Sequence, residues 1–335
     1  MKKEFVINKL STEFCHGSTI IELSDKELLC CWFGGSFEGR DDTAVYACRK
    51  SALGWGDPYV VAAGRTAHWN PVLFRRKNGE LMLFFKKGMA IADWETMVLR
   101  SSDNGSTWSA PETLSEDGFC GGGPVRNKPI FASDDRIVAG GSAERGVWTA
   151  FTSVSDDDGK SWRRSAPVAI EGITYDGEPT VANSEIAVSK QSFYGRGVIQ
   201  PTLWKDEEDC LHMLLRSSEG SIYRSDSSDN GFTWNGPYPI DLPNNNSAID
   251  LVRYSANGRL YLVCNPVAEN WGQRSPLSIF CSRDNGYTWE NFADAETGEG
   301  EYSYPAIIES SAGLLVTYTW NRKNIVCLEL AKSDL

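Results

Sequence analysis

The sequence predicts an all-β fold built from repeated units, and three observations carry this prediction. The first is an eight-residue phrase, Ser-x-Asp-x-Gly-x-x-Trp, which occurs four times in the 335 residues. The second is the even spacing of these copies along most of the chain. The third is a series of short apolar runs of strand length, separated by turn-forming residues, with no amphipathic run of helical length.

The four copies of the phrase end at Trp108, Trp162, Trp234 and Trp289. Four specified letters match by chance at only about 10⁻⁵ of starting positions, so the copies are internal repeats. Each copy predicts a hairpin turn in which Asp accepts backbone hydrogen bonds, Gly supplies a positive φ, and Ser and Thr satisfy further turn amides. The Trp is expected to be largely buried between neighbouring sheets, where it anchors the turn.

The spacing of the copies indicates the size of the repeated unit. Trp108 and Trp162 are 54 residues apart, and Trp234 and Trp289 are 55 apart, which suits a four-stranded propeller blade with its loops. An eroded copy over residues 47–55 ends 53 residues before Trp108. The gap of 72 residues between Trp162 and Trp234 predicts one blade plus an insertion near residues 168–191.

The two ends of the chain are expected to complete one blade together. The last unit begins at Tyr302 and lacks a final strand before Leu335, whereas Glu4–Ile7 has the character of a strand. The sequence therefore predicts a six-bladed β-propeller, with seven blades as the alternative. Because the repeat spans the chain without a linker, we expect a single domain over residues 1–335.

Composition narrows the classes of function and location. The net charge of −12 and the pI of about 4.9 argue against a nucleic-acid partner. The N-terminus lacks the apolar core of a signal peptide, and no apolar run of membrane-spanning length follows, so no membrane partner is expected. Nine cysteines, mostly in strand-like runs, predict buried thiols in the cytoplasm, a reducing compartment. Without a CxxC or HExxH motif, neither a metal nor another cofactor is expected, and the oligomeric state stays open.

The repeated phrase resembles the Asp box of the sialidase superfamily, and the resemblance extends over essentially the whole chain. It implies a sialidase-like β-propeller with four perfect Asp boxes, each joining the outer two strands of a blade and serving a structural role. It also implies that ligands bind at one mouth of a central tunnel, which is lined by the innermost strand of each blade. The polar segments that open the units are therefore the candidates for the site.

The same resemblance implies roles for particular residues. In sialidases three arginines hold the substrate carboxylate, a tyrosine supported by a glutamate is the nucleophile, and an aspartate is the acid/base. Arg216 and Arg274 match the second and third arginines. The nucleophile strand holds Tyr302 and Tyr304, and the acid/base position falls near Asp41 and Asp42. Polar residues of the unit-opening segments are further substrate-binding candidates: Arg40, Lys128 and Asn246.

Two departures from the sialidase pattern change the expected chemistry. His16 stands where the first arginine would be, and Gln200 stands where the supporting glutamate would be. A neutral amide cannot accept the phenol proton, so the tyrosine would be a poor nucleophile. A histidine ordinarily titrates near pH 6.5, which suits proton transfer at neutral pH.

Four further segments resemble the branch of the superfamily that contains rhamnosyl-glucuronate lyases and related glycosidases: residues 15–19, 32–39, 68–71 and 242–247. This resemblance implies that His16 or His68 transfers a proton, that arginines hold a uronate, and that Tyr304 acts as an acid. The sequence thus predicts an enzyme, a glycoside hydrolase or polysaccharide lyase, that cleaves a terminal glycosidic bond in an acidic oligosaccharide. The alternatives are an authentic exo-α-sialidase and a non-catalytic glycan-binding propeller.

Overall fold

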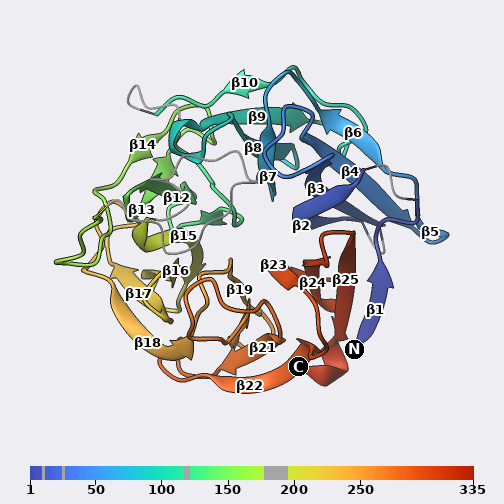
Figure 1. The fold of residues 1–335 in the computed structure, drawn as a ribbon. Coiled ribbons are helices and arrows are strands. Elements are labelled where there is room, and N and C mark those ends of the chain that lie inside the picture. Colours follow the sequence, from blue (N-terminus) through green and yellow to red (C-terminus); the bar gives the residue numbers. More distant parts are fainter. Residues whose placement is uncertain (10–11, 25–26, 117–120, 177–194) are drawn as a thin grey trace.

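The computed structural model describes residues 1–9, 12–24, 27–116, 121–176 and 195–335. Its described strands form sheets that follow one another in a ring around a common centre (Figure 1). Two short 3₁₀ turns, η1 at Ile91–Asp93 and η2 at Lys332–Asp334, are the helical elements of the described residues. The prediction of an all-β fold is confirmed. No helix in this part of the chain is long and apolar enough to cross a membrane.

Three of the sheets are formed entirely by strands that are close in sequence. The first holds β2 (Phe14–Ser24), β3 (Glu27–Gly35), β4 (Ala44–Ser51), β5 (Gly54–Trp55) and β6 (Tyr59–Ala62). The second holds β7 (His68–Arg75), β8 (Leu81–Lys87), β9 (Glu95–Ser101) and β10 (Glu112–Thr113). A later sheet holds β19 (Asp250–Arg253), β20 (Leu260–Cys264), β21 (Leu277–Ser282) and β22 (Glu290–Glu296).

The longest sheet joins two antiparallel units. One unit consists of β11 (Ile130–Phe131), β12 (Ile137–Arg145), β13 (Val147–Ser155) and β14 (Arg163–Arg164). The other consists of β15 (Arg196–Lys205), β16 (Leu211–Ser217), β17 (Ser221–Ser227) and β18 (Tyr238–Pro243). A short parallel pairing of β13 with β15 connects them. Of the insertion predicted near residues 168–191, Val168 bridges to Ala150, and residues 177–194 lie outside the described residues.

The two ends of the chain meet in one sheet. It holds β23 (Tyr302–Ser310), β24 (Gly313–Trp320), β25 (Asn324–Ala331) and, outermost, β1 (Lys2–Phe5). β1 pairs antiparallel with β25, so the N-terminal segment does supply the strand that the last unit lacks. The strand begins at Lys2, two residues earlier than expected.

The four repeated phrases form turns with the same hydrogen bonds. In the first, the Ser101 hydroxyl accepts a bond from Gly105 N at 2.7 Å, and Asp103 accepts bonds from the backbone and hydroxyl of Thr107 at 2.9 and 2.6 Å. The same pattern recurs in the turns that contain Asp157, Asp229 and Asp284. Each turn glycine has a positive φ, from 76° to 88°, so the turn depends on glycine at this position.

The tryptophans of the four turns differ in burial. Trp162 is 4% exposed and belongs to an apolar cluster shared by β8 and β12. Trp108, Trp234 and Trp289 are half-buried and pack against the neighbouring clusters. None of the four is exposed, as expected, but only Trp162 is fully buried. Their turns lie at the surface end of the sheets, so one edge of the indole keeps contact with water.

Replacing Trp162 with Ala should lower the free energy of unfolding by about 3–5 kcal/mol, because a large buried side chain leaves a cavity. Trp234→Ala should cost clearly less, since its ring is half-buried. Urea unfolding of both variants measures the difference. Equal losses in the two variants would show that burial in the cluster is not what makes Trp162 important.

The innermost strands share an irregularity that positions side chains at the centre of the ring. The register shifts between paired strands at Gly17, Asn70, Gln200 and Tyr304, and each of these residues has a φ between 46° and 59°. A bulge of this kind bends a strand and redirects its side chains. A Cβ on Gly17 would lie 2.5 Å from the Phe33 ring, so glycine is required there. Non-glycine residues at positive φ carry strain, which is common at functional sites.

Candidate active site

Three arginines from different units of the ring surround the phenol ring of Tyr304. The guanidinium carbons of Arg126, Arg216 and Arg274 lie 5.5, 5.8 and 5.3 Å from the ring centroid. Arg216 Nη1 donates a hydrogen bond to the Tyr304 hydroxyl at 3.2 Å. In a chain with a net charge of −12 this gathering of cations creates a local site for an anion.

Arg216 is buried and held in one orientation by neutral groups. Its Nε donates to Asn246 Oδ1 at 3.1 Å, and its Nη1 donates to Gln200 Oε1 at 3.1 Å. The Gln200 amide in turn donates to Glu144 Oε1 at 3.2 Å. Gln200 and Asn246 are both buried, with φ values of 53° and 61°. These amides orient the guanidinium without neutralising it.

Arg126 is the most deeply placed of the three arginines. It is 1% exposed, and Nη2 donates to the backbone oxygens of Tyr304 and Pro305 at 2.6 and 3.1 Å. Its Nε and Nη1 have no hydrogen-bond partner within the described residues. Burial lowers the pKa of Arg126 to about 10, so it stays protonated at neutral pH. A buried cation with unused donors is suited to an anionic ligand.

Arg274 is anchored by a carboxylate that it shares with a further arginine. Arg274 Nη1 donates to Glu301 Oε1 at 2.7 Å, and Arg322 Nε donates to both oxygens of Glu301 at 3.0 Å. Arg322 also pairs with Glu38. Although burial opposes ionisation, Arg274 and Arg322 lower the pKa of Glu301 to about 2. The carboxylate therefore stays charged and holds both arginines in place.

Glu301→Gln should reduce stability at neutral pH and flatten its dependence on pH. The pKa of Glu301 lies below its ordinary 4.5, so its contribution is present above about pH 4.5 and is lost as pH falls towards 2. The shift corresponds to at most about 3 kcal/mol. Unfolding by urea at pH 7 and pH 3 measures the change, with Glu290→Gln, at an exposed ion pair with Arg283, as the control. Parallel pH curves for wild type and Glu301→Gln would contradict the assignment.

His16 lies against Tyr304 and is fully buried. The two ring centroids are 4.0 Å apart, and the other face of the imidazole is near Phe33, at 5.6 Å between centroids. Burial, followed by the charges of nearby arginines, lowers the pKa of His16 well below 6.5. The expectation that this histidine titrates near neutral pH is therefore wrong, and its imidazole is neutral at pH 7.

The hydrogen bonds of Thr319 assign the proton of the imidazole. Thr319 Oγ1 accepts a bond from Gly17 N at 3.1 Å and lies 2.9 Å from His16 Nδ1. If the Thr319 hydroxyl donates to His16 Nδ1, the hydroxyl proton has an acceptor. If His16 Nδ1–H donated to Thr319 instead, the buried hydroxyl proton would have no acceptor. The imidazole proton therefore sits on Nε2, which has no partner among the described residues. His16 thus offers an N–H donor to a ligand.

Other residues predicted for the site have different surroundings. His68 packs against Phe85 with ring centroids 4.7 Å apart, and burial lowers its pKa. The Tyr302 hydroxyl donates to Glu299 O at 3.0 Å within an apolar cluster. Lys128 uses its ammonium group on both oxygens of Asp250 and on Leu251 O, at 2.7 to 3.0 Å. Tyr302 N donates to Arg274 O at 2.9 Å, but none of these side-chain contacts joins the three residues to the guanidinium groups around Tyr304.

The predicted acid/base residues lie on the connection between β3 and β4. Arg40, Asp41 and Asp42 are exposed. Asp42 folds back to accept hydrogen bonds from the backbone and hydroxyl of Ser36, both at 3.0 Å. From the same connection, Glu38 reaches the central cluster through its ion pair with Arg322.

Several residues of the cluster were not singled out from the sequence. Arg126 stands in the same unit-opening segment as Lys128, and Glu301 directly precedes Tyr302. Recurrence of polar residues at these openings is a signal that could have found both. Glu144 and Arg322 lie at the far ends of β12 and β24, where the sequence gives no comparable signal.

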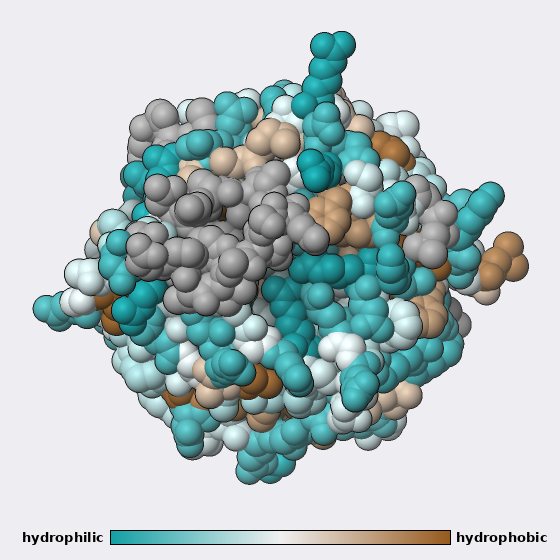
Figure 2. Space-filling model, viewed as in Figure 1, coloured by the Kyte–Doolittle hydropathy of each residue, from teal (hydrophilic) through white to brown (hydrophobic). Residues whose placement is uncertain are grey.

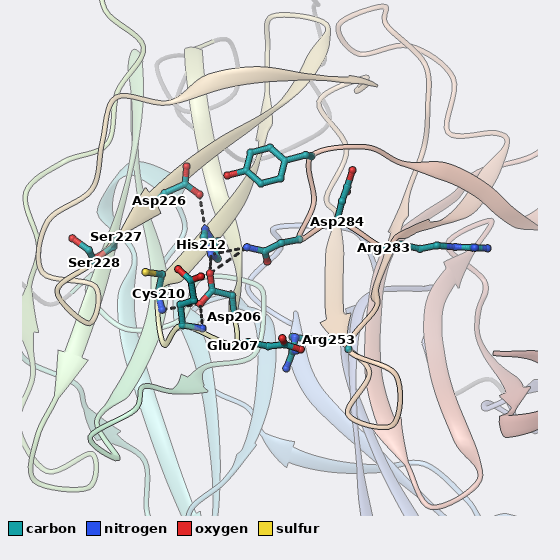
Figure 3. A pocket seen from close by; sticks show the side chains of 14 residues that line it. Asp206, Glu207, Cys210, His212, Asp226, Ser227, Ser228, Arg253, Arg283 and Asp284 are labelled. Carbon is teal, nitrogen blue, oxygen red and sulfur yellow. Dashed lines mark hydrogen bonds and ion pairs between the residues drawn. The ribbon is translucent and has the colours of Figure 1, made fainter.

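A second polar pocket lies at the opposite ends of the strands that carry Gln200 and Arg216 (Figure 3). His212 bridges Asp226 and Asp206, at 2.5 and 2.8 Å from its two ring nitrogens, and stacks on Trp204. His212 and Arg216 are four residues apart on β16, or about 13 Å. The carboxylates satisfy the imidazole, and Asn285 of the fourth turn adds a bond to Asp206 at 3.2 Å. The cluster joins neighbouring sheets.

Hydrophilic residues gather around the middle of the face viewed in Figure 2, in keeping with a polar centre. In the described part of the chain no group of three or more His, Cys, Asp or Glu residues is arranged to hold a metal ion. The polar groups that the structure places in the cluster are arginines, an imidazole, a phenol, amides and carboxylates.

Solved structures with the same arrangement of sheets include sialidases. The Hadza microbial sialidase Hz136 superposes with a TM-score of 0.74 at 15% identity, over 97% of this chain and 67% of that one. A protein of unknown function from Dyadobacter fermentans superposes with a TM-score of 0.74 at 15% identity, over 97% of this chain and 98% of that one. The NanB sialidase from Streptococcus pneumoniae superposes with a TM-score of 0.73 at 11% identity, over 97% of this chain and 69% of that one. At these identities the likeness concerns the fold. No curated protein matches the sequence.

The ring of antiparallel sheets defines a sialidase-like protein of the β-propeller type. Residues 26–316 match the BNR repeat-like domain, and the chain belongs to this family within the sialidase-like superfamily.

Proposed function

We propose that the protein is a carbohydrate-active enzyme that cleaves a terminal glycosidic bond in an acidic oligosaccharide. The observation that carries the proposal is the convergence of Arg126, Arg216 and Arg274 around Tyr304, beside His16. Guanidinium groups pair with carboxylates through charge-assisted hydrogen bonds. A sugar carboxylate bound there would place its ring next to a neutral imidazole and a phenol.

Different groups around the bound sugar can contribute to different steps of bond cleavage. The arginines neutralise the carboxylate and position the ring, and in hydrolysis water would add at the anomeric carbon as the glycosidic C–O bond breaks, one proton of that water replacing the proton given to the leaving oxygen. His16 Nε2–H and the Tyr304 hydroxyl are the donors available for a leaving oxygen. Gln200 cannot accept the phenol proton, and its amide is already used by Arg216 and Glu144. The predicted catalytic roles of Asp41, Asp42, His68 and Tyr302 remain proposals, as do substrate contacts from Arg40, Lys128 and Asn246.

Product analysis on a panel of uronate- and sialate-capped oligosaccharides tests the proposal. Release of the terminal sugar from one capped substrate is the expected result, and a uronate product with ultraviolet absorbance from a new C=C bond would identify elimination. No cleavage of any capped substrate, with no binding, would overturn the proposal. Binding without cleavage would favour the glycan-binding alternative instead.

Arg274→Ala should weaken the binding of a carboxylated sugar by roughly 1.5–3 kcal/mol, the scale of a hydrogen bond to a charged group. The reason is the loss of one guanidinium from the cluster around Tyr304. Calorimetric titration measures the affinity, and Arg283→Ala, at an exposed arginine in the fourth turn, is the control. Unchanged affinity in Arg274→Ala would remove this arginine from the site.

An exo-α-sialidase is the second candidate, supported by the hydrogen bond between Arg216 and the Tyr304 hydroxyl. Turnover of an aryl sialoside that disappears in Tyr304→Phe and survives in His16→Ala would establish it. If wild type lacks this activity and Gln200→Glu gains it, the neutral amide is what prevents tyrosine from acting as the nucleophile.

Two further parts of the proposal concern architecture and location. The antiparallel units support six blades in preference to seven. They also support a single domain that spans residues 1–335. The described cysteines are unpaired thiols, which supports a cytoplasmic location.

A further inference from the structure

A cavity of about 120 Å³ lies at the same end of the strands as the arginine cluster, between the β8–β9 connection and β12. Its lining includes Lys86, Trp94, Ser142, Glu144 and Arg145. Lys86 on β8 lies opposite Trp69 on β7 in the sheet, and Trp69 directly precedes the bulge at Asn70. The cavity therefore adjoins the bulged end of an inner strand.

One carboxylate belongs to both the cavity and the central cluster. Glu144 lines the cavity, and its Oε1 accepts a hydrogen bond from Gln200, which in turn accepts one from Arg216. The chain of side chains from Tyr304 to the cavity is therefore Arg216, Gln200 and Glu144. A ligand held over Tyr304 has this cavity as a neighbouring space.

The lining of the cavity suits a polar, uncharged ring. Trp94 Nε1 is buried without a hydrogen-bond partner within the described residues, and its ring tilts against Trp69 at 5.3 Å. Lys86 uses its ammonium group on Thr96 Oγ1, Gly121 O and Gly122 O at 2.6 to 3.1 Å. Arg145 donates to Ala92 O at 2.7 Å and pairs with Asp93.

Arg145 is thus paired with a carboxylate and Lys86 donates to neutral oxygens, whereas Arg126 at the centre keeps donors that are unused within the described part of the chain. The lining also holds the Trp94 indole, whose N–H has no partner among the described residues, and the Glu144 carboxylate, to which the Ser142 hydroxyl donates at 2.8 Å. Aromatic surface together with a few placed hydrogen-bonding groups is the usual chemistry of small-ligand pockets, and hydroxyl groups supply the acceptors that the indole N–H lacks.

We propose that this cavity binds the second sugar residue of the substrate, the one joined to the terminal acidic sugar, through its hydroxyl groups. This inference rests on the proposed function, because it assigns the acidic sugar to the arginine cluster. Trp94 is then a residue that determines preference for an oligosaccharide over a monosaccharide.

Titration calorimetry with two pairs of ligands tests the inference. The first pair is glucuronic acid and a thio-linked glucuronyl-glucose disaccharide, and the second is N-acetylneuraminic acid and its thio-linked disaccharide with galactose. Wild type should bind the disaccharide of one pair about tenfold more tightly than its monosaccharide. Trp94→Phe, which keeps the ring and removes the N–H, should weaken disaccharide binding about fivefold and leave the monosaccharide unchanged, as expected for one hydrogen bond.

Two further variants make the result specific. Ile91→Trp fills the cavity and should also weaken only the disaccharide, whereas Trp108→Phe, in the first turn, should change neither ligand. If a monosaccharide binds and its disaccharide binds no more tightly, or if Trp94→Phe weakens both equally, the cavity is not the second subsite. If no ligand of either pair binds wild type, the proposed function falls and this inference falls with it.

Discussion

His16→Ala is expected to lower kcat/KM for the cleaved oligosaccharide by roughly 10²–10⁴-fold, the usual contribution of a positioned proton-transfer group. His16 lies against Tyr304 and presents Nε2 without a protein partner. Tyr304→Phe should reduce activity less, because it removes one hydroxyl and leaves the arginines in place. Steady-state kinetics on the substrate found by product analysis measures both effects.

The pH dependence of wild type gives an independent check of the same residue. Because the pKa of His16 lies well below 6.5, kcat/KM should show no step near pH 6.5 from this group. His212→Ala is the matched control, since His212 is also buried but lies in the second polar pocket, away from the arginine cluster. Equal losses in the two histidine variants would mean that His16 acts only through stability, and robust activity in His16→Ala would remove it from the mechanism.

Asp250→Ala is expected to lower the free energy of unfolding by about 3–5 kcal/mol, because it removes a buried carboxylate and leaves the half-buried ammonium group of Lys128 and two buried donors without their acceptor. Asp250 is 1% exposed and accepts bonds from Lys128, from Thr202 Oγ1 at 2.6 Å and from Ile307 N at 2.9 Å. These donors come from three other units of the ring. One carboxylate therefore ties together four units near the centre.

Asp250→Asn should be less damaging, since an amide oxygen still accepts bonds from Thr202 and Ile307. Urea unfolding at neutral pH measures both variants. Asp209→Ala is the control, because Asp209 forms an exposed ion pair with Lys205 in a turn. If Asp250→Ala is no more destabilising than Asp209→Ala, the carboxylate does not hold the inner strands together.

The repeated turns could be predicted from the sequence because their chemistry is local. Within one turn the partners of Asp103 are at most four residues away, so eight letters specify the hydrogen bonds and the positive φ. The pairing of β1 with β25 was also predictable, since the count of strands left one unit incomplete. The burial of the tryptophans was not predictable, because it depends on how far each turn projects beyond the neighbouring sheets.

The candidate site was only partly predictable. His16, Gln200, Arg216, Arg274 and Tyr304 were singled out one by one, and the structure brings them together. Motif position could not distinguish Tyr304 from Tyr302, because residues two apart share one face of a regular strand. The irregularity of β23 at Tyr304, which has a positive φ, separates the two rings. Side-chain contacts between different units of the ring could not be predicted from the sequence either.

By itself the sequence determined the all-β class, the repeated turn and the polar character of the unit openings, because these depend on neighbours along the chain. Only the tertiary structure decided which cations lie around the phenol of Tyr304 and which cations pair with a carboxylate instead. Arg126 reaches Tyr304, 178 residues away, whereas Lys128, two residues further along, pairs with Asp250. Such choices follow from the closure of the ring, in which strands from distant repeats place side chains at the same buried centre and burial then sets their charge.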